Sequence, residues 1–286
     1  MKRIIIYFIL LLLFSHGTTL ASMSELDAKK IGMVIWSNEA DKRVDLLAYW
    51  GSYSSFPEIG IGHYIWYPQG QTGPYTAQFP PLCAYMQAHG VQFPQWLLDA
   101  CLAGGAPWQT RDEFMYDTQR TNELRQFLAS TVDLQTHFMI KRLEDEWLDI
   151  LAAAPFDRQA SLQHYFDLMR SSLLGTYALV DYLNFKGSGL NPREERNGHR
   201  FGLLQVMLDL PEGLNEENIT KAFAVCAARR LVNYIGQFHP EYRPVKFLAG
   251  WVKRVSTYAR QNIFDSVKRD LGAGDGQYAL CAHCFY

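Results

Sequence analysis

The chain has 286 residues, of which 48% are hydrophobic, and its formal net charge is −2. This length and apolar content suit one large domain or two small ones with a real core, and they argue against a disordered chain. Since 29 acidic residues outnumber 27 basic ones, a net positive charge that would attract an anionic polymer is absent, and we expect no nucleic-acid partner.

Residues 1–21 have the pattern of a secretory signal peptide. Two basic residues precede an uncharged apolar run over residues 4–14, and small residues continue to Ala21. We therefore predict cleavage after Ala21, a mature chain of residues 22–286 and a periplasmic or secreted location. The apolar run is about half the roughly 20 residues that span a bilayer, so a retained anchor is the less favoured alternative and we expect no stable membrane insertion after cleavage.

The cysteines fit an exported protein, where disulfides persist. There are five, Cys83, Cys101, Cys226, Cys281 and Cys284, so at least one is free or intermolecular. The last two form CAHC, which suits a redox pair, half a metal site or a tail disulfide. Because one CxxC lacks the third and fourth ligands that zinc needs, we favour a structural or incidental pair and predict no metal or organic cofactor.

The first predicted helix spans residues 25–38. Ser24, followed three residues later by Asp27, suits an N-cap, and apolar residues recur on one face of the segment. Glu39 then falls at the C-terminal end of this helix or just beyond it. Residues 52–68 are aromatic and β-branched with glycine breaks, which predicts a short hairpin or small sheet. The turn formers of residues 68–81 predict a surface loop.

Helices are predicted to dominate the rest of the chain. Thr110 and Glu113 form a capping box. The predicted helical segments are 122–153, as one long helix or two abutting ones, 157–174 with Asp157 as its cap, 215–235 and 244–271, which Gly272 stops. Residues 175–207 mix apolar patches with glycine and charge and predict a structured loop. The expected fold is α+β and predominantly helical, with a small hairpin lobe at about 36–80, a larger helical lobe at about 108–272 and a cleft between them.

Two carboxylates are the strongest candidates for chemistry. Glu39 ends the first helix, and Glu58 opens the segment EIGIGH, which also holds Gly60, Gly62 and His63. Glycoside hydrolysis needs one carboxyl that donates a proton to the leaving oxygen and a second that acts as nucleophile, positions water or stabilises positive charge. The apolar residues before Glu39 are of the kind that raises a carboxyl pKa.

The segment from Ile31 to Trp66, with NEA at 38–40 and EIGIGH at 58–63, resembles the phage-type lysozymes. In that family a catalytic glutamate ends the first helix and a hairpin of the form T-(I/V)-G-(Y/I)-G-H follows. The resemblance implies a lysozyme-like fold, Glu39 as general acid, and His63 as a structural residue. The last helix, with GWVKRVSTYAR at 250–260, is weakly similar to the arginine-rich C-terminal helix of the same enzymes.

The chain departs from that family at its second catalytic position. Glu58 aligns with the threonine that positions water, and residues 46–57 contain no acidic residue where the family carries an aspartate. The second catalytic role is therefore unfilled unless Glu58 takes it.

A second segment, FGLLQVM at 201–207, is weakly similar to the GLMQ signature of lytic transglycosylases. The resemblance implies that Gln205, with Asn184 and Asp181, hydrogen-bonds sugar hydroxyls or N-acetyl groups. The favoured alternative is a helix that packs into the core. Among the aromatic residues around the hairpin, Tyr64 and Trp66 are candidates for stacking on sugar rings, although core packing explains them equally well.

Structural alternatives exist for the other site residues. Gly60 and Gly62 suit positive φ or close packing in a hairpin, Glu58 suits a solvated turn, and Glu39 suits a helix end, although the helix dipole disfavours a carboxylate there. A hydrolase built on a Cys/His pair has no motif to support it.

The sequence therefore predicts an exported, lysozyme-like glycosidase, a muramidase or lytic transglycosylase, that cleaves β-1,4 bonds of peptidoglycan with Glu39 as general acid. The alternative is a non-catalytic glycan-binding or envelope-associated protein with a degenerate cleft, and a third is a muramidase-like toxin delivered outside the cell. Hydrolysis or transglycosylation, retention or inversion, and the exact glycan stay open.

Overall fold

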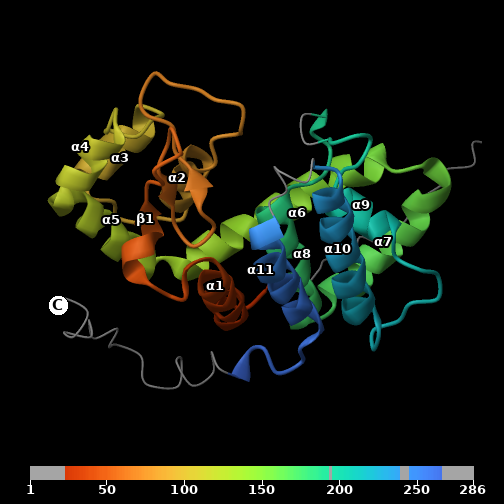
Figure 1. Ribbon diagram of the computed structural model, residues 1–286. Helices are drawn as coiled ribbons and strands as arrows, with labels where there is room; N and C mark the ends of the chain where they lie inside the picture. Colours follow the sequence, from red (N-terminus) through yellow and green to blue (C-terminus); the bar gives the residue numbers. More distant parts are fainter. Residues whose placement is uncertain (1–22, 193–194, 239–244, 266–286) are drawn as a thin grey trace, which may run out of the picture.

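A computed structural model describes residues 23–192, 195–238 and 245–265. Within them the chain is predominantly helical with one three-stranded antiparallel sheet, which confirms the predicted α+β class. The strands and α2 to α5 gather at one end of the molecule, and α7, α9 and α10 lie at the other (Figure 1). The predicted signal peptide lies outside the described residues. None of the described helices is long and apolar enough to cross a bilayer.

The N-terminal helix α1 (Glu25–Ala40) includes Glu39, so it runs two residues farther than predicted. Ser24 caps it as expected, because its side chain accepts a hydrogen bond from the backbone N–H of Asp27. A short 3₁₀ helix, η1 (Val44–Leu47), leads into the sheet.

The predicted hairpin or small sheet is a three-stranded sheet whose first strand precedes residue 52. Its strands are β1 (Ala48–Tyr49), β2 (Glu58–Ile59) and β3 (Tyr64–Ile65), in the order β1-β2-β3. Glu58 pairs with Tyr49 on one side and with Ile65 on the other. Glu58 is therefore held in a central strand and not in a free turn.

Two helices that the sequence prediction did not delimit follow the loop after the sheet, α2 (Phe79–Ala88) and α3 (Gln95–Leu102). A disulfide between Cys83 and Cys101 joins them. Of the other cysteines, Cys226 is a buried free thiol, and Cys281 and Cys284 lie outside the described residues.

Replacing both Cys83 and Cys101 by alanine is expected to lower the free energy of unfolding by about 3 kcal/mol, because the crosslink closes a loop of 18 residues in the unfolded chain. Urea unfolding of the double variant and of the oxidised wild type measures this. Reduced wild type should unfold at nearly the same midpoint as the double variant. Equal midpoints for the variant and the oxidised wild type would contradict the prediction.

The predicted capping box at Thr110 opens α4 (Arg111–Tyr116). The Thr110 hydroxyl accepts from the backbone N–H of Glu113 at 3.2 Å, and the Glu113 carboxylate accepts from the N–H of Gln109 at 2.7 Å. The apolar series that follows forms two abutting helices, α5 (Thr118–Ser130) and α6 (Val132–Ala153). Helix α6 packs against α1, α2, α7 and α8 and so connects the two ends of the fold.

The helix predicted to start at Asp157 starts at Phe156 and ends at Arg170 (α7). The predicted loop over 175–207 is wrong in its first part, which is the helix α8 (Leu173–Lys186). Every residue from 174 to 183 in α8 is buried, so the helix has no polar face and no periodicity that a sequence pattern reveals. The described loop residues are 187–192 and 195–202, and α9 (Leu203–Leu208) follows them.

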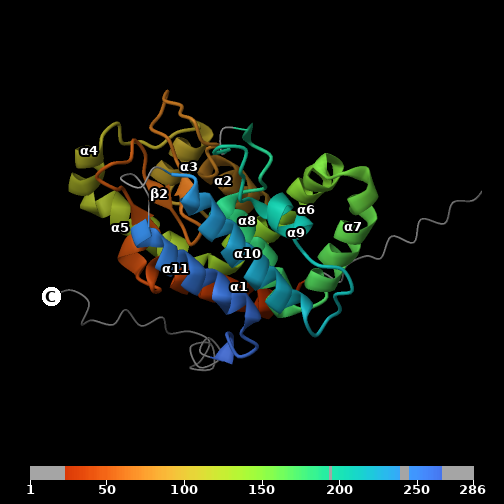
Figure 2. The same cartoon turned by 45° about the vertical axis from the view of Figure 1, so that its right-hand side comes forward.

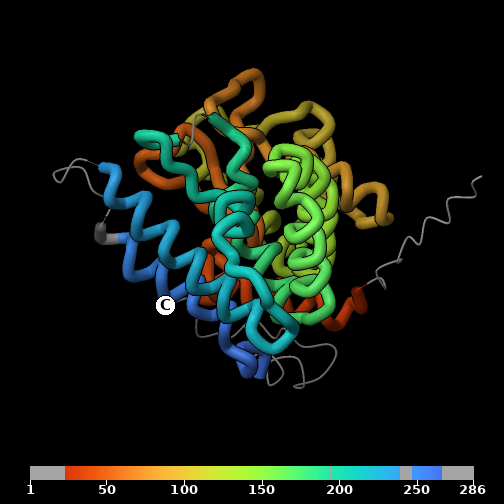
Figure 3. The backbone as a smooth tube through the Cα atoms, turned by 90° about the vertical axis from the view of Figure 1, so that its right-hand side faces the viewer, coloured from red at the N-terminus to blue at the C-terminus, as the bar shows by residue number. Residues whose placement is uncertain are grey.

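The last described helices are α10 (Ile219–Gly236) and α11 (Val245–Ser256), with a 3₁₀ turn, η4 (Thr257–Ala259), after α11. The predicted start at Asn215 is four residues early. The predicted helix from 244 to 271 is also too long, because α11 ends at Ser256; Gly272 lies outside the described residues. Helices α10 and α11 run side by side (Figures 2 and 3).

Candidate functional site

Glu39 lies in the last turn of α1, and its side chain is 15% exposed. The buried face of α1 packs on α6 and α8, which fixes the position of this end of the helix. The C-terminal end of a helix disfavours a carboxylate, and α1 has no basic residue in its last turn. A cation from another element is therefore needed to stabilise the Glu39 carboxylate.

Arg254 of α11 supplies this cation. Its Nη2 donates to Glu39 Oε1 at 2.7 Å and to Asp181 Oδ1 at 2.8 Å, and its Nε donates to Asp181 Oδ2 at 2.9 Å. Asp181 of α8 is fully buried and accepts a further hydrogen bond from the Tyr258 hydroxyl at 2.6 Å. Burial alone lowers the pKa of Arg254, but Asp181 and Glu39 outweigh it and raise that pKa well above its ordinary value.

A hydrogen-bond chain beside this cluster ties α1, α8 and η4 together. Asn38 Nδ2 donates to the Tyr177 hydroxyl at 2.7 Å, and that hydroxyl pairs with Thr257 Oγ1 at 2.7 Å. The residue next to Glu39 is thereby joined to α8 and η4, so the backbone that carries Glu39 is held from two sides.

The turn between β2 and β3 packs closely on the helices. Gly60 has φ of 79°, and a Cβ there would clash with the side chain of Gln135, which accepts from Ile61 N at 2.9 Å. Asn184 Nδ2 donates to Gly62 O at 3.2 Å, and a Cβ on Gly62 would lie 3.0 Å from Asn184 Oδ1. Both glycines therefore have a packing role, and Asn184 holds the turn against α8.

His63 stands between the two glutamates. Its Nδ1 lies 3.8 Å from Glu39 Oε2 and 3.9 Å from Glu58 Oε2. These two oxygens are therefore no farther apart than the sum of those distances. That upper limit is compatible with the roughly 5 Å carboxyl separation of retaining glycosidases and with the lower part of the roughly 6.5–9.5 Å range of inverting ones.

Glu58 differs from Glu39 because no arginine pairs with it among the described residues, and its side chain is 35% exposed. Burial and the negative charge of Glu39 raise the pKa of Glu58, and His63 opposes that shift in part. The protonated form of the Glu58 carboxyl is therefore favoured in the folded protein.

Glu58→Gln is expected to raise the urea unfolding midpoint at pH 7 and to leave it unchanged at pH 4. The raised pKa means that folding favours the protonated carboxyl, so wild-type stability falls as the pH rises from the ordinary value of 4.5 through the folded-state pKa. Exposed Glu212→Gln in a loop is the matched control and should show no such pH-dependent difference. A Glu58→Gln midpoint that is equal to or below that of wild type at pH 7 would contradict the prediction.

Three of the predicted sugar-binding residues, Tyr64, Trp66 and Asp181, are fully buried, whereas Asn184 and Gln205 are half-buried. Tyr64 and Trp66 are fully buried and pack on Phe138 and Phe79, so they offer no surface for stacking on a sugar. This corrects the stacking prediction and follows from their packing in the core between the sheet and the helices. Asp181 is likewise buried, and its carboxylate accepts hydrogen bonds from Arg254.

Gln205 is half-buried in α9, and its Nε2 donates to Gly189 O at 3.2 Å. It therefore anchors the loop after α8, and α9 presents buried apolar residues to the core as the structural alternative supposed. Among the predicted binding residues, Asn184 hydrogen-bonds the turn that carries His63.

Sequence reasoning missed Arg254 as a partner of Glu39, and it missed a group of half-buried side chains beside it, Phe185, Lys186, Phe201 and Trp251. The ring of Phe185 lies 4.2 Å from the guanidinium carbon of Arg254. The one signal in the sequence for this pairing was the presence of Arg254 in the predicted last helix, because an arginine is a suitable partner for buried acidic side chains.

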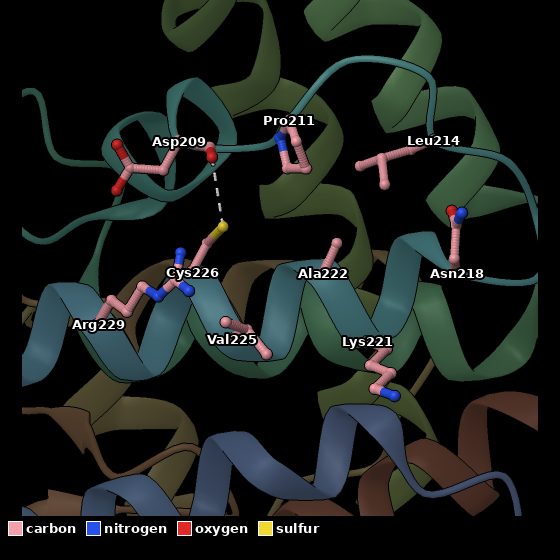
Figure 4. Close-up of a pocket in the computed structure, with 9 residues that line it drawn as sticks. All are labelled: Asp209, Pro211, Leu214, Asn218, Lys221, Ala222, Val225, Cys226 and Arg229. Atoms are coloured by element: carbon pink, nitrogen blue, oxygen red, sulfur yellow. Dashed lines mark hydrogen bonds between the residues drawn. The ribbon is translucent and has the colours of Figure 1, made fainter.

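Two cavities in the described residues lie away from Glu39 and Glu58. One of about 390 Å³ lies between α10 and the segment before it, where the Cys226 thiol donates to Asp209 O at 3.3 Å (Figure 4). The other, of about 670 Å³, includes His137 and Arg170. The predicted cleft between hairpin and helices thus has no counterpart in these two cavities.

Neither thiol considered for a Cys/His hydrolase has the properties of a nucleophile. Cys83 is in the disulfide, and burial raises the pKa of Cys226. Across the described segments, no three His, Cys, Asp or Glu side chains gather closely enough to hold a metal ion.

Comparisons with protein families, with curated proteins and with solved structures find no match for this chain.

Proposed function

We propose that this protein is an exported, lysozyme-like glycosidase that cleaves β-1,4 bonds of peptidoglycan with Glu39 and Glu58. The observation that carries the proposal is the geometry of the pair: two sheltered carboxylates, one at a helix end and one on a strand, both within 4 Å of the His63 ring. Support also comes from the resemblance of residues 31–66 to phage-type lysozymes.

In this proposal Glu39 donates the proton to the departing glycosidic oxygen. Arg254 stabilises its conjugate carboxylate once the proton has left, since the guanidinium already bonds Oε1. Burial and the negative charge of Glu39 raise the pKa of the neighbouring Glu58, so a carboxyl group beside Glu39 holds its proton to a higher pH than a free glutamate does.

Glu58 is the second carboxylate. Its place on the central strand allows it to attack the anomeric carbon, to orient water, or to stabilise positive charge while the muramic 6-hydroxyl attacks. The first gives retention, the second inversion, and the third an anhydro sugar.

The test incubates purified residues 22–286 with peptidoglycan sacculi beside a control lysozyme. Release of muropeptides supports the proposal, and reducing or anhydro ends on the products identify hydrolysis or transglycosylation. No release under conditions where the control lysozyme is active would reject it.

The second candidate function is a glycan-binding or envelope-associated protein without activity. The observation that favours this candidate is that Arg254 bonds both Asp181 and Glu39. A buried cluster in which every charge has a partner can serve to stabilise the fold alone, without catalysis. Binding of sacculi without release of muropeptides would support it.

A further inference from the structure

Lys186, the last residue of α8, has its ammonium group among three aromatic rings. Nζ lies 3.4 Å from the ring centroid of Trp251, 4.0 Å from that of Phe185 and 5.5 Å from that of Phe201. The rings come from α8, from the loop before α9 and from α11. Such contacts stabilise a cation without neutralising it.

The ammonium has no anionic partner in the part of the chain that the structure describes. The neighbouring carboxylate of Glu39 is already paired with Arg254, which also bonds Asp181. All four side chains of the group are half-buried, so solvent reaches the group. A half-buried cation that lacks a carboxylate is unusual, since buried charges are normally paired.

On balance, the surroundings of Lys186 disfavour its charged form. Burial, and next the positive charge of Arg254, lower its pKa to about 7, while the charge of Glu39 acts in the opposite direction. An anion that binds beside Lys186 would stabilise its charged ammonium form, and the attraction between the two charges would favour binding of the anion.

Lys186 is also close to the proposed catalytic residues. Phe185 is shared, because its ring contacts Lys186 Nζ at 4.0 Å and the Arg254 guanidinium carbon at 4.2 Å. Arg254 in turn bonds Glu39 at 2.7 Å. Two side chains, those of Phe185 and Arg254, therefore connect Lys186 to Glu39.

We propose that Lys186 and the rings of Phe185, Phe201 and Trp251 form a subsite that binds a carboxylate-bearing sugar unit of the glycan. The aromatic faces contact the apolar part of the unit, and the ammonium pairs with its carboxylate. This rests on the proposed function and makes the site selective for anionic glycans over neutral ones such as N-acetylglucosamine polymers.

Two sources of the carboxylate share this chemistry in peptidoglycan, the lactyl group of a muramic unit freed of its peptide and an acidic residue of an attached stem peptide. Both place a carboxylate on the muramic unit and not on the neighbouring sugar. The subsite therefore also fixes which of the two alternating sugars lies beside Glu39.

Binding of soluble glycan chains to Glu39→Gln, which keeps the chains intact, tests the proposal by calorimetry. Four preparations separate the sources: chains with stem peptides, chains stripped to the free lactyl carboxylate, and each of these two after conversion of all carboxylates to methylamides. We expect at least one anionic preparation to bind about tenfold more tightly than its amidated form, the gain of one charge-assisted hydrogen bond.

The added substitution Lys186→Met should abolish that preference and leave the affinity for amidated chains within about twofold, whereas Lys186→Arg should keep it. Circular dichroism and thermal melting verify that each variant is folded, and Lys253→Met, on the exposed face of α11, is the matched loss of a charge. A preference that survives in Lys186→Met, or equal binding of anionic and amidated chains, overturns the proposal. Absence of binding to every preparation would instead reject the proposed function.

Discussion

Glu39→Gln is expected to lower the rate of muropeptide release from sacculi by at least about 10²-fold, with binding of the glycan retained. A positioned general acid contributes roughly 10²–10⁴-fold, and glutamine keeps the shape of the side chain and its contact with Arg254 without a proton to give. Initial rates of soluble muropeptide production, measured by chromatography, check this.

Glu25→Gln is the control, since it lies in the first turn of the same helix and is exposed. It should keep the full rate. Equal rates for Glu39→Gln and the wild type would show that Glu39 is not the acid, and the same loss in Glu25→Gln would trace the effect to the helix and not to the site.

Arg254→Met is expected to lower the free energy of unfolding by about 3–5 kcal/mol. The substitution leaves Asp181, which is fully buried, with a negative charge and with the Tyr258 hydroxyl as its remaining described partner. Glu39 loses its bond at the same time, although its partial exposure makes that loss smaller. Urea unfolding at pH 7 measures the change.

A second substitution tests the cause. In Asp181→Leu/Arg254→Met both charges are gone, so part of the lost stability should return, because a buried pair costs less when replaced whole than when broken. Lys253→Met, in an exposed position of the same helix, should change stability little. If Arg254→Met unfolds at the wild-type midpoint, the cluster does not stabilise the fold.

Local signals predicted several elements well. The Ser24 cap and the Thr110–Glu113 box start helices where expected, because each depends on hydrogen bonds between residues three or four apart. The glycine and aromatic pattern of residues 52–68 indicated β structure, and strands β2 and β3 lie within that segment. Local patterns missed α8, because a helix buried on every side shows no amphipathic repeat.

The candidate site, too, contains residues that local sequence patterns indicated and residues that only the tertiary structure revealed. The sequence by itself singled out Glu39, Glu58 and His63, because the turn glycines between them and the end of the first helix are features of neighbouring residues. Only the tertiary structure shows that Arg254 bonds Glu39, 215 positions away in the sequence. It also shows that Asp181 is fully buried and that Tyr64 and Trp66 lie in the core. Caps and turns are determined by backbone groups a few residues apart, whereas a charge's partner depends on how whole helices pack, and no short stretch of sequence contains that information.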